Sequence, residues 1–211
     1  MKKVITTICL LAICTISYAQ DKGKTYLNLN YSSASLSQPA TSSISNKFGA
    51  GFTIGHTYYL HKEPVANLFW FGIDATWFDL NYNNFSYDYK SYNNDKTQKE
   101  SIHQGEIGVH IGPSVSINPV DKLNVKAYFR YAPSCAVLYD TKADDPSFNY
   151  ASMFVGGLSI NYGIIGIGFE ARFGSTKLQE YQFVRESGKK AEEKKVDTDI
   201  SGFRAYLSFR F

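Results

Sequence analysis

Alternation of apolar and polar residues runs through most of the chain and restricts it to β-structure. The C-terminal end shows it most clearly: every odd position from 203 to 211 is apolar, while Arg204 and mostly polar residues hold the even positions. Eight such segments can be counted, at 25–32, 48–60, 68–80, 102–117, 122–139, 148–162, 164–178 and 200–211. A period of two places successive side chains on opposite faces of a strand, whereas a helix needs about 3.6 residues. The pattern therefore predicts an all-β fold.

The N-terminus predicts export of the protein. Lys2 and Lys3 precede a mostly apolar stretch at 4–16, and Ser17 and Ala19 stand at the −3 and −1 positions of a cleavage site. We therefore expect a signal peptide at 1–19 and one mature domain at 20–211. Of the three cysteines only Cys135 remains after cleavage, so the mature chain cannot form an internal disulfide.

The two faces of the expected strands differ in a way that favours a membrane over water. One face is aliphatic and aromatic, while the other carries acids and bases. Unpaired ionised groups in a soluble core are costly. In a membrane only a closed barrel satisfies the backbone of strands, and its apolar face then meets lipid. The sequence thus predicts an eight-stranded antiparallel up-and-down transmembrane β-barrel, although a soluble lipocalin-like barrel would also be consistent with the alternation.

Several charged residues fall near the middle of their strands and are expected to point into the barrel. Eight strands leave an interior just wide enough for side chains. We expect an ion-pair network that plugs this interior, the alternative being residues that water wets along the wall of a narrow porin-like channel for small solutes. The predicted network is Asp74, Glu106, Arg130, Glu170, Arg172 and Arg204.

The connections between the segments alternate in length. Short ones are expected at 61–67, 118–121 and 162–163, and long ones at 33–47, 81–101, 140–147 and 179–199. Transmembrane barrels have short periplasmic turns and longer extracellular loops, with aromatic girdles at both interfaces. The expected girdles are Tyr58, Tyr59, Phe69, Trp70 and Tyr162 at the turn end, and Tyr31, Trp77, Tyr139 and Tyr150 at the loop end.

The signal, the eight strands and the C-terminal strand resemble the small OmpA/OmpX-type outer-membrane barrels, and more closely the outer-membrane β-barrel domain proteins of Bacteroidota. The resemblance covers about Lys24 to Phe211. It implies an outer-membrane location, contact with membrane lipid and lipopolysaccharide, and insertion by the barrel assembly machinery. In this resemblance Phe209 and Phe211 form the assembly signal and Arg204 matches its polar position, while Tyr206 stands where glycine is usual. The family does not imply one activity.

An enzymatic alternative rests on three polar residues. Ser101, His103 and Asp79 share the lipid-facing phase, and hairpin pairing could bring Asp79 near His103. A serine, a histidine and an acid can activate a hydroxyl for acyl ester cleavage. This vaguely resembles the lipid A deacylases, which carry His-x-Ser where this chain has Ser-x-His. We expect no enzyme, and four dispersed histidines predict neither a metal site nor a cofactor.

The segment 81–101 is rich in Tyr and Asn, which suits a binding surface because tyrosine gives large contacts at low entropic cost. An extracellular ligand could bind there through Tyr82, Tyr87, Tyr89 and Tyr92. The formal net charge of +3 includes two lysines of the signal, so a nucleic-acid partner gains no support. We therefore predict an outer-membrane barrel with a structural or surface-binding role.

Overall fold

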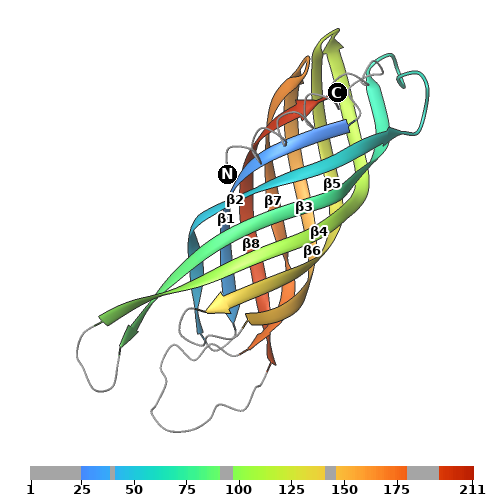
Figure 1. The fold of residues 1–211 in the computed structure, drawn as a ribbon. Coiled ribbons are helices and arrows are strands. Elements are labelled where there is room, and N and C mark those ends of the chain that lie inside the picture. The colour runs from blue at the N-terminus through green and yellow to red at the C-terminus, as the bar shows by residue number, and fades with distance from the viewer. Residues whose placement is uncertain (1–24, 39–40, 91–96, 141–145, 180–194) are drawn as a thin grey trace, which may run out of the picture.

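The computed structural model describes residues 25–38, 41–90, 97–140, 146–179 and 195–211, and these form a closed antiparallel barrel (Figure 1). Each strand pairs with the next along the chain, and β1 pairs with β8 to close the sheet. The strands are β1 Thr25–Gln38, β2 Thr41–Tyr59, β3 Phe69–Lys90, β4 Thr97–Val120, β5 Leu123–Asp140, β6 Pro146–Tyr162, β7 Ile165–Gln179 and β8 Lys195–Arg210. The predicted eight-stranded up-and-down barrel is confirmed. The predicted signal peptide lies outside the described residues.

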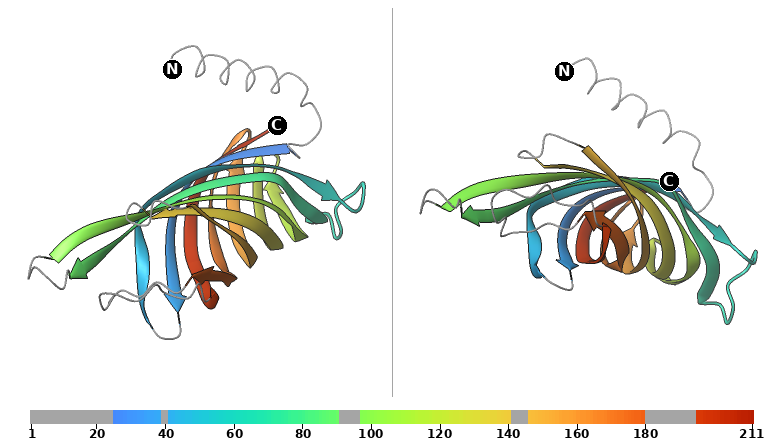
Figure 2. Two further views of the ribbon diagram at one scale, coloured as in Figure 1. Left: turned by 60° about the horizontal axis from the view of Figure 1, so that its bottom comes forward. Right: turned by 90° about the horizontal axis from the view of Figure 1, so that it is seen from below.

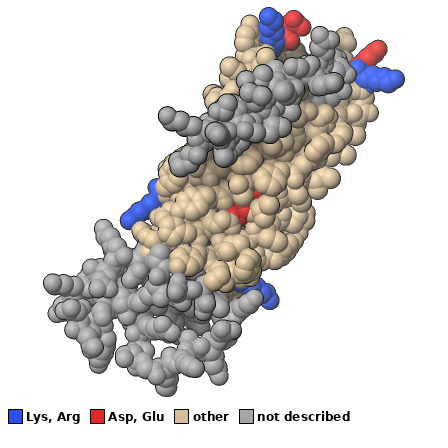
Figure 3. Space-filling model, in the orientation of Figure 1, with Lys and Arg blue, Asp and Glu red and all other residues tan. Residues whose placement is uncertain are grey.

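Alternate residues of each strand point to opposite sides of the barrel wall. On β4, Ile107, Val109 and Ile111 are about half exposed, while Glu106 and His110, which alternate with them, are buried. In the space-filling view the described wall is almost free of charged residues apart from a small acidic spot, and lysine, arginine and acidic side chains gather toward its ends (Figure 3). Among the described residues there is no helix with the length and apolar character needed to cross a membrane.

The strands are joined by short turns at one end of the barrel. These turns comprise residues 60–68, 121–122 and 163–164, and Gly163 supplies the positive φ of 59° that the last of them requires. The C-terminus lies at this end (Figure 1). At the opposite end, which we call the loop end, the β3–β4 hairpin projects beyond the rest of the wall, as the two views of Figure 2 also show. Because short turns are periplasmic in such barrels, the loop end is the extracellular side.

The strands are longer at the loop end than the sequence suggested. Residues 33–47 and 81–101 were expected to be loops, but β1 continues to Gln38 and β2 begins at Thr41, while β3 continues to Lys90 and β4 begins at Thr97. The reason is that the polarity of the two faces is reversed there: outward positions become polar and inward positions become apolar. On β1 the outward residues become Ser33, Ser35 and Ser37, while Ala34 and Leu36 point inward and are buried. Because most residues of such a segment are polar, the sequence pattern there resembles a loop and not a strand.

The same reversal occurs on neighbouring strands. Ile200 is buried between exposed Asp199 and Ser201 on β8, and Leu178 is buried beside exposed Lys177 on β7. The inward residues of the loop end form an apolar cluster inside the barrel. We call this part of the barrel the outer section; its large buried side chains are Leu36, Phe85, Ile102, Leu138, Met153, Leu178 and Ile200. The part nearer the turns, whose interior is charged, is the membrane section.

A β-bulge in β3 shifts the phase of one strand within the wall. The pairing of β3 with β4 is irregular between Thr76 and Asp79, and the pairing with β2 is irregular beside the same segment. Trp77 is 59% exposed on the outside, and Phe78 next to it is not buried either. The extra residue turns Asp79 inward, where it is fully buried. The prediction that Asp79 faces lipid is therefore wrong.

Candidate functional site: an ion-pair network in the barrel interior

A continuous series of ion pairs fills the interior of the membrane section. It alternates positive and negative side chains and includes all six residues that the sequence singled out, together with Lys126 and Asp79. In order of contact the ion-pair network is Lys126, Asp74, Arg130, Glu170, Arg204, Asp79, Arg172 and Glu106. The network thus contains four cations and four carboxylates, and no member is more than 7% exposed.

Asp74 of β3 anchors the end of the network nearest the turns. It forms an ion pair with Lys126 and lies 3.2 Å from Nη1 of Arg130, both on β5. The Tyr26 hydroxyl donates to its Oδ1 at 2.6 Å, and the Thr57 hydroxyl donates to its Oδ2 at 2.9 Å. Every oxygen of this buried carboxylate therefore has partners, which is the condition under which a buried charge is tolerated.

Glu170 of β7 links the middle of the network across the barrel. It forms an ion pair with Arg130 of β5 and lies 3.8 Å from Nη1 of Arg204 on β8. The Tyr128 hydroxyl donates to Oε1 of Glu170 at 2.9 Å, and it also lies 2.8 Å from the Tyr206 hydroxyl. Tyr128 of β5 thus hydrogen-bonds Glu170 directly, and Tyr206 of β8 lies within hydrogen-bond distance of Tyr128.

Asp79 contacts the charged side chains that lie nearest the outer section. Arg204 binds it with both terminal nitrogens, Nη1 to Oδ1 at 2.8 Å and Nη2 to Oδ2 at 3.0 Å, which is the strong bidentate geometry of this pair. His110 Nε2 lies 3.4 Å from Oδ2, and Arg172 reaches the same oxygen at 4.0 Å. Arg172 in turn pairs with Glu106 at 2.5 Å.

Two members of the network were not predicted. Lys126 lies on the predicted interior face, as does His110 beside the network, but neither was included, and Asp79 was assigned to the lipid face. The apolar pair Trp77 and Phe78 directly before Asp79 breaks the alternation, and this was the one sequence signal of the bulge. Among the described residues, no three His, Cys, Asp or Glu side chains are grouped as metal ligands.

Three interior tyrosines each lie across a glycine on the adjacent strand. The register pairs Tyr26 with Gly55, Tyr128 with Gly157, and Tyr206 with Gly168. A Cβ atom on Gly157 or Gly168 would lie 2.4 Å or 2.2 Å from Cζ of the facing ring, and a Cβ on Gly55 would lie 2.3 Å from the Tyr26 hydroxyl. The glycines therefore let the rings lie along the wall, which leaves the centre of the barrel to the charges.

The serine, histidine and acid of the enzymatic alternative are not brought together. Asp79 points into the barrel and pairs with Gly108, whereas His103 pairs with Asn84 further along the same hairpin. Nδ1 of His103 lies 2.6 Å from the Tyr82 hydroxyl and 3.2 Å from Nδ2 of Asn84. The expectation that hairpin pairing could place Asp79 beside His103 is therefore wrong, because the bulge turns Asp79 inward.

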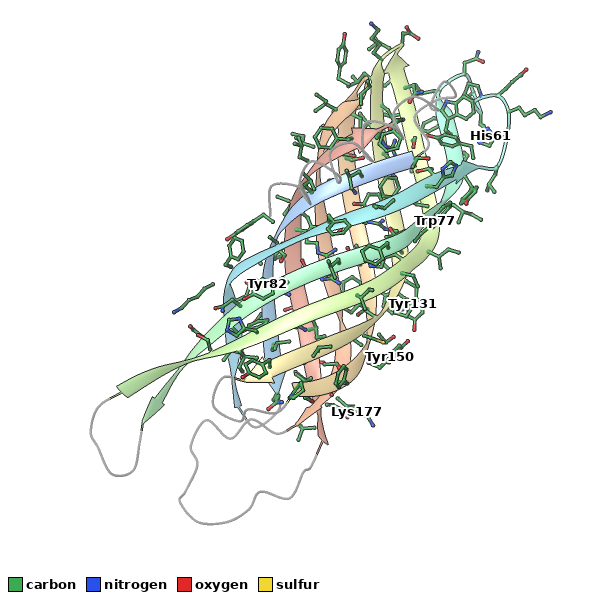
Figure 4. The ribbon with its side chains drawn as sticks, in the orientation of Figure 1. His61, Trp77, Tyr82, Tyr131, Tyr150 and Lys177 are labelled. Carbon is green, nitrogen blue, oxygen red and sulfur yellow. The ribbon has the colours of Figure 1, made fainter. Side chains whose placement is uncertain are left out.

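The predicted binding tyrosines do not form one loop. Tyr82 lies on the outer wall toward the loop end, 40% exposed, with Tyr131, Tyr150 and Lys177 at the same end (Figure 4). Tyr87 and Tyr89 belong to β3, where they pair with Glu100 and Gln98 of β4. Tyr92 lies outside the described residues.

The predicted assembly residues lie where the sheet closes. Phe209 pairs with Leu27 of β1 on one side and Ile165 of β7 on the other. Phe211 exchanges two backbone hydrogen bonds with Thr25, each 3.0 Å long. Phe211 thus extends the backbone pairing between β8 and β1.

The turn-end aromatics differ from the expected girdle at two positions, Tyr59 and Trp70. Tyr58, Phe69 and Tyr162 are exposed on the outer wall, but Trp70 points inward and is only 7% exposed. It packs against Tyr59, with the ring centroids 5.3 Å apart. Tyr59 and Trp70 therefore line the interior at the turn end and are not girdle residues.

Comparisons with known proteins agree with the barrel. No protein-family model matches the chain, and no curated protein does. Neisserial surface protein A is similar to this chain, with 11% sequence identity and a TM-score of 0.50. The match covers 90% of this chain and 98% of that one. Ail of Yersinia pestis (8% identity, TM-score 0.44, 90% and 100% coverage) and the protease OmpT of Escherichia coli (10%, 0.41, 89% and 97%) are also similar.

The likeness to Neisserial surface protein A, at a TM-score of 0.50, supports the fold. The narrower likeness to proteins of Bacteroidota has no support in the comparisons and stays a prediction. Barrels of this kind are closed sheets whose apolar outer wall requires lipid, and the wall described above has that character. The chain is accordingly a small eight-stranded β-barrel of the outer-membrane type, and the outer membrane is where it resides.

Proposed function

We propose that the protein is a non-conducting, non-enzymatic barrel that serves the outer membrane as a structural element and as a surface for binding. The observation that carries this proposal is the filled interior. The ion-pair network occupies the membrane section, and the apolar cluster occupies the outer section above it. A solute crossing the barrel would have to displace both.

The space left beside the network supports the absence of a channel. A cavity bordered by Tyr26, Tyr128 and Arg130 has a volume of about 10 Å³, which is roughly enough for the centre of one water molecule. The network residues come from β3, β4, β5, β7 and β8 and join across the lumen, so they cross-link the wall instead of lining an open pore.

Planar-bilayer conductance tests the proposal. The purified mature protein, with its folded state verified by heat-modifiable migration in a detergent gel, is expected to give no stable single-channel steps. Reproducible steps of one amplitude would overturn the plug and favour a narrow channel for small solutes. A surface variant, Lys177→Gln, is a matched control, because Lys177 is exposed on the outer wall and lies outside the network.

We assign the binding role to the β3–β4 hairpin, which projects furthest from the barrel (Figures 1 and 2). It carries Tyr87 and Tyr89 in a part of β3 that pairs with β4, and tyrosine supplies large contact area at low conformational-entropy cost. The partner would be an extracellular ligand. In a deletion strain, the full chain should restore both envelope resistance to detergent and adhesion to protein-coated surfaces. A variant lacking residues 88–99 should restore only the former; full adhesion by that variant would refute the assignment.

Lipopolysaccharide is the lipid partner that we propose for the outer wall. Lys177 lies exposed just beyond the apolar wall at the loop end, where anionic headgroups of the outer leaflet would meet it. Purified Lys177→Gln should retain less lipopolysaccharide per barrel than the unchanged protein. Equal retention would exclude this residue as a contact.

Insertion by the barrel assembly machinery is the last part of the proposal, and it rests on Phe211. Deleting Phe211 removes the residue that exchanges two backbone hydrogen bonds with Thr25. We expect the amount inserted in cells to fall far more than the yield of folding in detergent, both measured by heat-modifiable migration. Equal losses in the two assays would mean that Phe211 contributes to folding alone.

A further inference from the structure

The barrel opens at the turn end into a cavity of about 590 Å³. Arg210 and Asn161 line it from the barrel wall, Tyr59 and Trp70 form an aromatic side, and the β4–β5 turn contributes Asn118 and Lys122. This volume lies within the range of about 300–1,000 Å³ that small-molecule sites occupy. Neither the ion-pair network nor the proposed binding hairpin uses this cavity.

Arg210 is a buried cation outside the balanced network. It is 5% exposed, and none of the described carboxylates forms an ion pair with it. Its described partners are neutral: Nη1 donates to Asn124 Oδ1 at 3.1 Å, and Nη2 donates to Thr57 Oγ1 at 3.3 Å. A guanidinium carries more N–H donors than these two bonds use. Because the network already pairs four cations with four carboxylates, the charge of Arg210 is left in excess.

A second buried side chain of the cavity lining has one polar atom without a hydrogen bond. Asn161 is 1% exposed, and its Oδ1, which lies beside Gly166, has no hydrogen bond, although its Nδ2 donates to Ser159 at 3.1 Å. Asn124 is held in place by donating to Asn118 Oδ1 at 2.7 Å while it accepts from Arg210. Unsatisfied groups of this kind are uncommon in folded proteins and are resolved by a bound ligand or water.

The aromatic side of the cavity is held by ring contacts and a hydrogen bond. His61 stacks on Trp70 with ring centroids 5.4 Å apart and an interplanar angle of 13°, and His61 Nε2 accepts from the Phe71 backbone N–H at 2.9 Å. Trp70 is thus held between His61 and Tyr59. A flat or apolar part of a ligand could pack on this side without reorganising it.

We propose that the turn-end cavity binds a small organic anion. Its carboxylate or phosphate group is held by the guanidinium of Arg210, a neutral hydrogen-bonding group meets Asn161, and its body packs beside Trp70. The arginine fork matches both anions geometrically. The two further charges of the lining, Lys122 and Asp121 in the β4–β5 turn, are opposite in sign and leave Arg210 as the net charge of the cavity.

Fluorescence of Trp70 provides the test, because the chain has only two tryptophans and Trp77 faces outward. In the mature Trp77→Phe protein in zwitterionic detergent, we would titrate N-acetylglycine, inorganic phosphate and neutral N-acetylglycinamide at matched ionic strength. A saturable change with one or both anions and none with the neutral amide is expected. The stronger of the two anions identifies the group. No saturable change with either anion, or an equal change with the amide, would overturn the proposal.

Three variants in the same background locate the site. Arg210→Gln should weaken anion binding at least tenfold, whereas Lys47→Gln, at an exposed position of β2 toward the opposite end, should leave it unchanged. Asn161→Asp keeps Arg210 and the side-chain shape but adds a negative charge to the cavity, so it should also abolish binding and serves if Arg210→Gln does not fold. Folding is checked by heat-modifiable migration. Unchanged affinity in a folded Arg210→Gln or Asn161→Asp protein would refute the site.

Discussion

In the membrane section the interior holds the ion-pair network and the outward side chains are apolar; in the outer section the interior holds an apolar cluster and many outward side chains are polar. On β8, Arg204 is buried and Leu207 exposed near the middle, whereas Ile200 is buried and Ser201 exposed toward the loop end. The backbone pairing with β1 and β7 continues through both sections. One continuous sheet therefore faces lipid in one part and water in the other. Only the side chains, and not the backbone pairing, change at the boundary.

The difference teaches how each interior is stabilised. The outer section uses the ordinary means of a water-soluble barrel, in which apolar side chains leave water for a packed core. The membrane section cannot gain much in that way, because lipid is as apolar as its outer wall. Its interior relies instead on paired charges and hydrogen bonds, which are directional and join strands distant in sequence, such as Asp79 of β3 and Arg204 of β8.

The largest effect is expected from breaking the network at Asp79. Asp79→Ala leaves Arg204 buried without its bidentate partner, and loss of one member of a buried pair costs about 3–5 kcal/mol. Urea unfolding of the refolded protein in vesicles measures this change. Asp79→Ala combined with Arg204→Met should recover part of the loss. If the double variant were as unstable as the sum of the singles, the two residues would not act as a pair.

A core deletion in the outer section should act differently. Leu178 is 2% exposed within the apolar cluster, and Leu178→Ala should cost about 2–4 kcal/mol through lost burial and a residual cavity. Because the cluster lies at one end, amide hydrogen exchange should rise mainly in the outer section. Uniformly faster exchange along whole strands would show that the two sections unfold as one unit and would break the comparison.

Charges placed on the outer wall of a single strand locate the boundary between the sections. Leu207→Lys on β8 puts a cation against lipid and should cost up to about 2–4 kcal/mol, depending on depth. Ser201→Lys on the same face should change stability by less than about 0.5 kcal/mol, because that position faces water. Comparable costs at the two positions, measured by unfolding in vesicles, would place both in the same solvent.

The smallest effect is expected from a single hydroxyl of the membrane section. Tyr206→Phe removes the hydroxyl that lies 2.8 Å from the Tyr128 hydroxyl but leaves the ring against Gly168, so the loss should be about 0.5–1.5 kcal/mol. Tyr31→Phe, on the exposed outer wall, is the matched control. A loss in Tyr206→Phe no greater than that of the control would mean that the tyrosine pair contributes only packing.

Much of the membrane section could be predicted from the sequence because its pattern is uniform. Apolar residues at alternate positions identified the strands, and charges on the opposite face gave six members of the network. Asp79 could not be placed, because a single bulged residue after Thr76 reverses every later side chain of that strand. The strand ends were missed for a related reason: Ser33, Ser35 and Ser37 resemble a loop until Ala34 and Leu36 are known to face a core.

The three tyrosine–glycine pairs also restrict how the sequence of this barrel could change over time. Each ring occupies the volume that a side chain on the facing strand would need, so Gly168 cannot acquire a side chain while Tyr206 remains, and the same holds for Gly157 and Tyr128. A smaller residue in place of the tyrosine would have to come first or at the same time. The two positions of each pair are therefore expected to covary among descendants of this barrel, although they are far apart along the chain.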